Sequence, residues 1–175
     1  MTKKIIVYFI ITFIMLFGTA AFSFGQFIPN APFKEELLKA PDFSLKDLEG
    51  KTYRLSKSAG KPVLLFFGAT WCPACRTEIP SMKDIYATYT PQGLEIAYIN
   101  IGESAKRVAR FVQTNKLPYR TLLDESEDVA DLYNIVGVPT FILIDRKGII
   151  INISHRSADL SLTKIFPPNN QGVKK

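Results

Sequence analysis

The sequence predicts an α/β sandwich with a mixed central sheet. Two apolar runs of strand length are each followed by a stretch with helical spacing, and a hairpin signal follows near the end of the chain. Strands that alternate with helices pair in parallel, whereas the two strands of a hairpin pair antiparallel. A sheet that contains both kinds of pairing is therefore expected.

Apolar runs locate the strands. Residues 62–69, PVLLFFGA, are almost continuously apolar, which suits a central strand buried on both faces of the sheet. Residues 94–101, LEIAYINI, predict a second strong strand. Residues 140–145 and 149–154 flank Arg146-Lys147-Gly148, a turn signal that predicts a hairpin. Shorter strands are expected at 52–55, after a turn at 47–51, and at 119–123.

Apolar residues at spacings of three and four locate the helices. The clearest helix is expected at 73–89, where Pro80 should introduce a kink. Its buried side is expected to carry Ile79, Met82, Ile85, Tyr86 and Tyr89. Further helices are expected at 103–116, 125–133 and 159–166.

The first 25 residues predict export from the cytoplasm. Lys3 and Lys4 precede the unbroken apolar run 5–17, and the small residues of 18–25 follow it, which is the order of a secretory signal peptide. Counted as 5–24, the same run is also long enough to anchor the chain in a membrane. Both interpretations remain open. Both place the remainder outside the cytoplasm, in the periplasm or at the outer face of the cell membrane.

Composition and charge are those of one ordinary globular domain with short appendages. We expect a signal peptide or membrane anchor at 1–25, a linker at 26–39, a folded domain at 40–166 and a flexible tail at 167–175. The chain carries 22 Lys and Arg against 16 Asp and Glu, a formal net charge of +6. This excess is mild and spread along the sequence, which argues against binding to nucleic acid.

The only two cysteines stand three positions apart, in Trp71-Cys72-Pro73-Ala74-Cys75. At the start of the predicted helix this spacing puts both sulfurs on one face, where they can bond and separate with little backbone movement. The free N–H groups and the dipole of the helix start favour a thiolate at Cys72, which we expect to be the attacking residue. Cys75, one turn further in, is expected to resolve the mixed disulfide. Pro73 suits the first helical turn, and Trp71 is expected to shield the sulfur from solvent and to pack into the core.

A zinc site and a structural disulfide are the alternatives to redox chemistry at this pair. A zinc site needs four ligands, but the chain supplies two cysteines and one distant histidine, His155. A purely structural disulfide between Cys72 and Cys75 would close almost no loop, so it would stabilise the fold little. We therefore expect no metal and no cofactor beyond the redox-active cysteine pair.

Several motifs follow one another along the chain. They are Ala40-Pro41-Asp42-Phe43, Gly50-Lys51, Gly60-Lys61-Pro62, Trp71-Cys72-Pro73-Ala74-Cys75, Glu78-Ile79-Pro80, Val138-Pro139-Thr140 and Asp145-Arg146-Lys147-Gly148. In this succession, residues 40–155 resemble the TlpA/ResA-like branch of the thioredoxin superfamily. The resemblance implies a thioredoxin-like three-layer sandwich with an N-terminal hairpin and an inserted helix-strand segment, expected at 103–123. It also implies an exported, often membrane-tethered protein that reduces disulfides in extracytoplasmic proteins, including apocytochromes c, and is re-reduced by a membrane thiol protein.

The resemblance also suggests roles for residues outside the cysteine pair. Taken alone, Pro139 would only end a loop, but the resemblance implies a cis Val138–Pro139 bond that faces the thiols. The backbone of Val138 would then pair with an extended segment of the substrate. Glu78 is either an acid that exchanges the proton of Cys75 or a surface residue of the first helical turns. His155 is expected to be solvated or packed rather than to act as a base.

Three functions compete at this point. The first is a thiol-disulfide oxidoreductase, and a reductase is favoured because no histidine between the cysteines stabilises the thiolate strongly. The second is a peroxiredoxin-like peroxidase, whose typical motif has Pro and Thr where this chain has Leu65 and Ala69. The third is a thioredoxin-fold binding module without enzymatic activity, in which the disulfide is structural.

Overall fold

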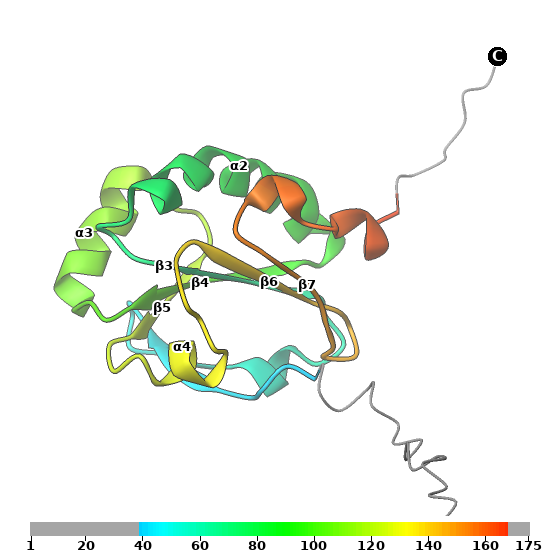
Figure 1. Cartoon of the computed structure of the whole chain (residues 1–175), viewed down its shortest axis with the longest axis horizontal. Coiled ribbons are helices and arrows are strands. Elements are labelled where there is room, and N and C mark those ends of the chain that lie inside the picture. The colour runs from blue at the N-terminus through cyan, green and yellow to red at the C-terminus, as the bar shows by residue number, and fades with distance from the viewer. Residues whose placement is uncertain (1–38, 168–175) are drawn as a thin grey trace, which may run out of the picture. The chain divides into compact units, whose positions relative to one another are not determined.

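The computed structural model describes residues 39–167, which form one seven-stranded sheet with helices on both faces (Figure 1). The strand order is β2-β1-β5-β4-β3-β6-β7. The predicted signal peptide or anchor, residues 26–38 of the linker and residues 168–175 of the tail lie outside the described residues. Among residues 39–167, no helix is both long and apolar enough to cross a bilayer.

The sheet is mixed, as the sequence predicts. Its strands are β1 (Ser44–Asp47), β2 (Thr52–Arg54), β3 (Val63–Gly68), β4 (Glu95–Ile101), β5 (Arg120–Asp124), β6 (Thr140–Ile144) and β7 (Ile150–Ser154). The central strands β3, β4 and β5 are parallel. Strand β1 pairs antiparallel with β2 and β5, and β6 pairs antiparallel with β3 and β7. The predicted N-terminal hairpin is thus β1–β2, and the second hairpin is β6–β7.

Three α-helices lie against this sheet. They are α2 (Pro73–Tyr89), α3 (Ala105–Asn115) and α4 (Asp128–Leu132), with the short 3-10 turns η1 (Leu55–Ser58), η2 (Thr90–Gln92), η3 (Ser157–Asp159) and η4 (Leu162–Lys164). Helices α2 and α3 cover one face and α4 lies on the other (Figure 1). Helix α2 has the predicted bounds and continues through Pro80. The segment 103–123 supplies α3 and β5, and β5 lies between β4 and β1.

The prediction of a helix at 159–166 is wrong. Two 3-10 turns, η3 and η4, lie there instead, and Leu160 between them is extended, with φ −71° and ψ 125°. The N–H of Ser161 donates to the side chain of Asn152 on β7 at 3.2 Å. Leu162 and Phe166 still face the core. Their spacing of four is that of a helix, which explains the wrong prediction.

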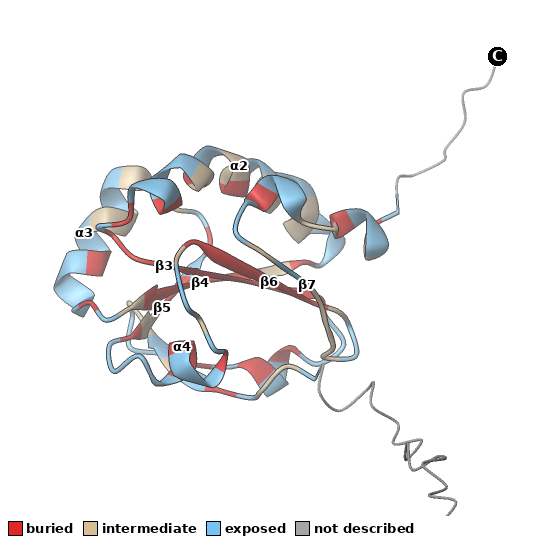
Figure 2. Ribbon diagram, in the orientation of Figure 1, coloured by how far each residue is buried: buried red, intermediate tan, exposed pale blue. Residues whose placement is uncertain are grey.

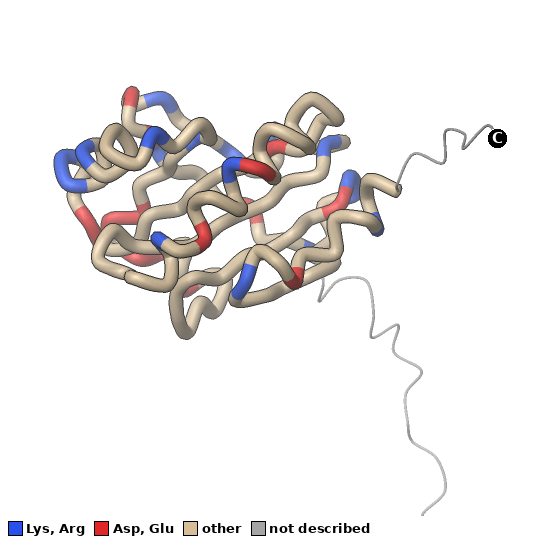
Figure 3. The backbone as a smooth tube through the Cα atoms, turned by 90° about the horizontal axis from the view of Figure 1, so that it is seen from above, with Lys and Arg blue, Asp and Glu red and all other residues tan. Residues whose placement is uncertain are grey.

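Strand β3 divides the hydrophobic core into two clusters. Leu64 and Phe66 pack on the side of α2 and α3, whereas Val63, Leu65 and Phe67 pack on the side of α4. All residues of β3 are buried, which confirms the prediction of a strand covered on both faces. Figure 2 shows the buried strands between helices whose outer sides are exposed. Over the described residues, Lys and Arg are interspersed with Asp and Glu (Figure 3).

The pairing of β3 with β6 brings two distant motifs together. Strand β3 ends at Gly68 and leads through the loop 69–72 into α2. Because β6 runs antiparallel to β3, its first residue, Thr140, lies opposite Phe67. The segment before β6, which contains Pro139, therefore lies at the same edge of the sheet as the cysteines.

Candidate active site

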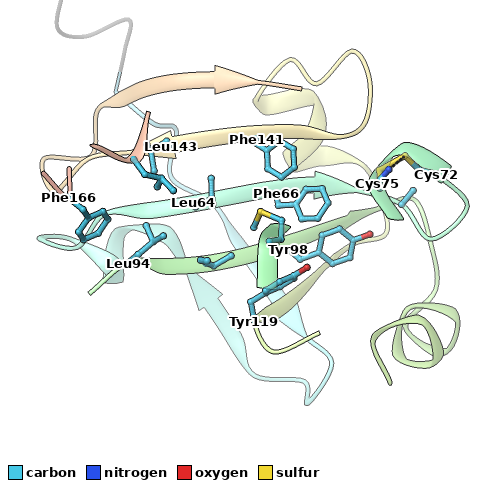
Figure 4. Packing of buried hydrophobic residues seen from close by; sticks show 14 residues of the cluster. Leu64, Phe66, Cys72, Cys75, Leu94, Tyr98, Tyr119, Phe141, Leu143 and Phe166 are labelled. Carbon is cyan, nitrogen blue, oxygen red and sulfur yellow. Dashed lines mark hydrogen bonds between the residues drawn. A yellow bond between two sulfur atoms is a disulfide. The ribbon is translucent and has the colours of Figure 1, made fainter. Parts of the chain in front are cut away.

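Cys72 and Cys75 form a disulfide at the start of α2, with their Cα atoms 5.3 Å apart. Cys72 is the N-cap residue of the helix, and its sulfur accepts a hydrogen bond from the N–H of Cys75 at 3.0 Å. Pro73 follows in the first helical turn, as predicted. Figure 4 shows the two cysteines at one end of the buried cluster, beyond Phe66 and Tyr98. The helix start thus directs an N–H group at the outer sulfur, which is the geometry that stabilises a thiolate.

The exposure of the two cysteines and the tryptophan differs sharply. Cys72 is 3% exposed and Cys75 is 1% exposed, whereas Trp71 is 63% exposed. The expectation that Trp71 packs into the core is therefore wrong. Its indole lies at the surface beside a buried disulfide, where an approaching protein would meet it.

The Val138–Pro139 bond is cis, which confirms the prediction. The carbonyl oxygen of Val138 lies 3.6 Å from the sulfur of Cys72. A disulfide sulfur carries no proton, so this is a contact rather than a hydrogen bond, although a thiol in its place could donate to Val138. The structure therefore brings the cysteine pair and Pro139 together, as the resemblance implies.

His155 holds the loop that contains Pro139. Its Nδ1 lies 2.9 Å from the carbonyl oxygen of Pro139, which can only accept, so Nδ1 carries the proton. The hydroxyl of Thr140 donates to the carbonyl of Gly137 at 2.7 Å and also lies 3.2 Å from Nδ1. His155 is exposed, which agrees with the expectation of a solvated histidine, and its ring is bonded to the loop that contains Pro139.

Glu78 connects α2 to η3. Its carboxylate accepts hydrogen bonds from the N–H of Ser157, at 2.9 Å, and from the Ser157 hydroxyl. The same hydroxyl lies 2.9 Å from that of Ser81. Glu78 is half-buried, and these bonds give it a structural role between α2 and η3.

Glu103 is a residue of the site that the sequence did not reveal. The sequence places it at the start of a helix, but α3 begins at Ala105 and the Glu103 side chain is only 5% exposed. Its two oxygens accept from the N–H and the hydroxyl of Thr70 at 2.6 Å each, and from Nδ2 of Asn100 at 3.0 Å. Burial raises the pKa of Glu103, but the bonds from Thr70 and Asn100 outweigh it, so its pKa lies below the ordinary value.

Gly68 lets the loop before Cys72 pass close to the core. A Cβ atom on Gly68 would lie 2.7 Å from Cε2 of Tyr98, a ring that is fully buried. The loop therefore begins under an aromatic ring, and Ala69 after it is buried as well. A side chain at position 68 would collide with this buried ring, which favours glycine at the end of β3.

A cleft of about 360 Å³ lies at the other end of the strands. It is lined by residues such as Lys61, Val63 at the start of β3 and Ile144 at the end of β6, and no residue around the disulfide lines it. Within residues 39–167, no three His, Cys, Asp or Glu side chains converge so as to hold a metal ion.

Comparison with known proteins identifies the family. Residues 38–153 match the AhpC/TSA family. The chain is 33% identical over 152 residues to a protein named thiol-disulfide oxidoreductase ResA from Bacillus cereus, and the match covers 86% of this chain and 88% of the relative. A protein of the same name from Geobacillus thermodenitrificans is 40% identical over 109 residues, or 62% of this chain and 63% of the relative, so this match spans less than two thirds of its length.

Solved structures give the same picture. The crystal structure of a putative thiol:disulfide interchange protein DsbE from Chlorobium tepidum superposes with a TM-score of 0.66 at 30% sequence identity. The superposition covers 72% of this chain and 90% of that one. The sheet and the flanking helices are thus those of a thioredoxin-like fold.

Proposed function

The chain belongs to the AhpC/TSA family and, within it, to the ResA-like branch of the thioredoxin superfamily, and from this premise we propose that it is a thiol-disulfide oxidoreductase. The single observation that carries the proposal is the sulfur of Cys72, which caps α2, accepts from the N–H of Cys75 and lies against Val138. A sulfur in this position is stabilised as a thiolate when the disulfide is reduced.

The proposed reaction uses the two cysteines in turn. The Cys72 thiolate forms a bond with one sulfur of a substrate disulfide, and the other substrate sulfur leaves as a thiolate. Cys75 loses its proton and attacks the sulfur of Cys72, which releases the second substrate sulfur and closes the Cys72–Cys75 disulfide. Two electrons pass to the substrate, and a dithiol donor must return them.

We propose that the substrates are disulfide-containing proteins outside the cytoplasm, with apocytochromes c among them, and that the donor is a membrane thiol protein. The predicted export signal in residues 1–25 supports this location. Whether residues 5–24 are removed or retained as an anchor stays a prediction. The backbone of Val138 is proposed to pair with the substrate, and Trp71 to cover the disulfide exchange from the solvent side.

Trapping of mixed disulfides tests the proposal. The full-length Cys75→Ala variant, produced in its native compartment, should accumulate partner proteins that are joined through Cys72 and released by dithiothreitol. The matched control is the double variant Cys72→Ala/Cys75→Ala, which should trap nothing. If Cys75→Ala traps no partner and the purified wild type does not reduce insulin, the proposed function is wrong.

Peroxidase activity is the second candidate, because the AhpC/TSA match raises it. Leu65 and Ala69 stand where the peroxidatic motif has Pro and Thr, and Cys75 lies one helical turn from Cys72 as a ready resolving thiol. We therefore expect purified protein to reduce insulin disulfides and to leave hydrogen peroxide unconsumed. Rapid peroxide consumption without insulin reduction would reverse the assignment.

A further inference from the structure

Thr70 lies two residues before Cys72 and has all its polar groups bound to charged side chains. Its N–H and hydroxyl donate to Glu103, on the loop between β4 and α3. Its carbonyl oxygen accepts from Nε and Nη2 of Arg76 at 3.1 and 2.6 Å. Arg76 belongs to the first turn of α2, so the loop before the cysteines is fixed from two separate elements.

Burial of the charged Glu103 carboxylate carries a large desolvation penalty. A buried charge lowers stability unless hydrogen bonds replace its lost hydration. Glu103 has those bonds, but its nearest cation, Arg107, is 3.7 Å away and mostly exposed. A neutral side chain could fill the same space at a smaller desolvation penalty, so the charge points to a role beyond packing.

We propose that Glu103 and Arg76 are positioning residues that clamp Thr70 and thereby hold the sulfur of Cys72 at the start of α2, next to Val138. The inference rests on the redox function proposed above. Neither residue is assigned contact with the sulfur, because both act through Thr70: Glu103 binds its N–H and its hydroxyl, and Arg76 binds its carbonyl oxygen. The clamp keeps the loop 69–72 rigid while the disulfide opens and closes.

Two effects of the clamp on Cys72 have opposite signs. Rigid positioning keeps the N–H of Cys75 aimed at the sulfur and favours the thiolate, whereas the negative charge of Glu103 disfavours it. The charged or titratable side chains bonded to the segments around the pair are Arg76, Glu78, Glu103, Arg107 and His155. A variant that loosens the loop and one that removes the charge should therefore shift the reactivity of Cys72 in opposite directions.

The test uses the full-length chain with Cys75→Ala, so that only Cys72 reacts. The rate of alkylation by iodoacetamide is measured against pH for three added changes: Thr70→Val, Thr70→Ser and Glu103→Gln. Thr70→Val removes the hydroxyl without a change in charge. Glu103→Gln keeps an acceptor for the N–H of Thr70, and its amide can donate to the Thr70 hydroxyl oxygen, so it removes mainly the charge.

We expect Thr70→Val to move the midpoint of the alkylation profile to higher pH and to lower the rate at pH 7 about fivefold, the effect of one lost hydrogen bond. Thr70→Ser should restore the original profile. Glu103→Gln should move the midpoint to lower pH. If Thr70→Val leaves the profile unchanged, or if Thr70→Ser behaves like Thr70→Val, the proposal is overturned. The two Thr70 variants decide the question even if Glu103→Gln fails to fold.

Asp124→Asn is the matched control. Asp124 is a buried carboxylate whose side chain accepts from the N–H groups of Val129 and Ala130 in α4, at 3.2 and 2.8 Å, and not from Thr70. Its replacement should lower the thermal stability and leave the alkylation profile in place. An equal shift in Asp124→Asn would assign the effect to general loosening and overturn the clamp. Alkylation needs no protein substrate, so this result stands apart from the insulin and trapping experiments that test the function.

Discussion

Glu78 and Glu103 both bind segments next to the Cys72–Cys75 pair, but the protein holds them in different surroundings. Glu78 is half-buried and accepts from Ser157 on a 3-10 turn. Glu103 is almost fully buried and accepts three hydrogen bonds, two of them from Thr70. The first carboxylate lies three residues from Cys75 in the sequence, and the second reaches the site across 33 residues.

The difference shows that closeness to a motif in the sequence and closeness in space select different residues. Glu78 can meet water when its partner moves, so its bonds are replaceable. Glu103 cannot, because its partners are a buried backbone N–H, a buried hydroxyl and a buried amide. We therefore expect Glu103 to matter more for stability and Glu78 more for proton transfer.

The largest expected effect is that of Glu103→Ala on stability. Loss of the carboxylate leaves the N–H and hydroxyl of Thr70 buried without acceptors, so the free energy of unfolding should fall by about 3 kcal/mol. Denaturant unfolding of the oxidised protein measures this change. The control is Glu125→Ala, whose carboxylate caps an exposed N–H of Ala105 at 3.0 Å and should cost less than about 1 kcal/mol. Equal losses in both variants would contradict the comparison.

The next effect concerns the rate of resolution. If Glu78 exchanges the proton of Cys75, Glu78→Gln should slow the release of a mixed disulfide on Cys72 about a hundredfold, which is typical of lost general acid-base catalysis. Release of a thiol leaving group from a preformed mixed disulfide measures this step in stopped flow. An unchanged rate would mean that Glu78 does not transfer the proton of Cys75 and that it acts only through its bond to Ser157.

Acid should weaken the fold through Glu103. Its folded pKa lies below the unfolded value near 4.5, so its stabilisation is complete above that value and is lost as the pH falls through the folded pKa. The effect should be smaller than that of Glu103→Ala, because a protonated carboxyl still accepts a hydrogen bond. The pKa of Asp42 is also lowered, so Asp42 would contribute to the same acid sensitivity. The free energy of unfolding is therefore measured from about pH 6 to about pH 3 for both the wild type and Glu103→Gln. A parallel decline in both proteins would show that Glu103 does not contribute.

The smallest effect is expected for Arg107→Ala. Arg107 is 62% exposed and lies 3.7 Å from Glu103, one helical turn away, so the pair should contribute about 0.3 kcal/mol. Thermal unfolding at low and high salt measures this contribution. A loss as large as that of Glu103→Ala would mean that the ion pair, and not Thr70 and Asn100, sustains the buried carboxylate.

The sequence predicted the strands and helices that form from apolar runs and from the regular spacing of apolar residues. The apolar run at 62–69 became β3, and the spacing of apolar residues gave α2 its observed bounds. The helix expected at 159–166 is replaced by two 3-10 turns, and the N–H of Ser161 bonds to Asn152 on β7, a contact that the spacing of apolar residues does not reveal. Apolar character likewise misplaced Trp71, because an apolar side chain can also lie at the surface.

The sequence predicted those site residues that belong to short motifs. It did not predict the residues that come together only through the fold. The cysteine pair, Pro139 and the cis bond follow from short motifs and the resemblance they carry. The bonds from Glu103 to Thr70 depend on β3 and β4 lying side by side, with Gly68 opposite Asn100. One signal existed in the sequence, an acidic residue shortly after a fully apolar strand, but a helix start accounts for such a residue equally well.

The near-complete burial of Cys72 restricts what can react with it. With only 3% of Cys72 exposed in the disulfide form, a partner sulfur can approach it along few directions. We therefore expect a disulfide on a narrow, projecting stretch of polypeptide to react faster than one on a flat, rigid surface.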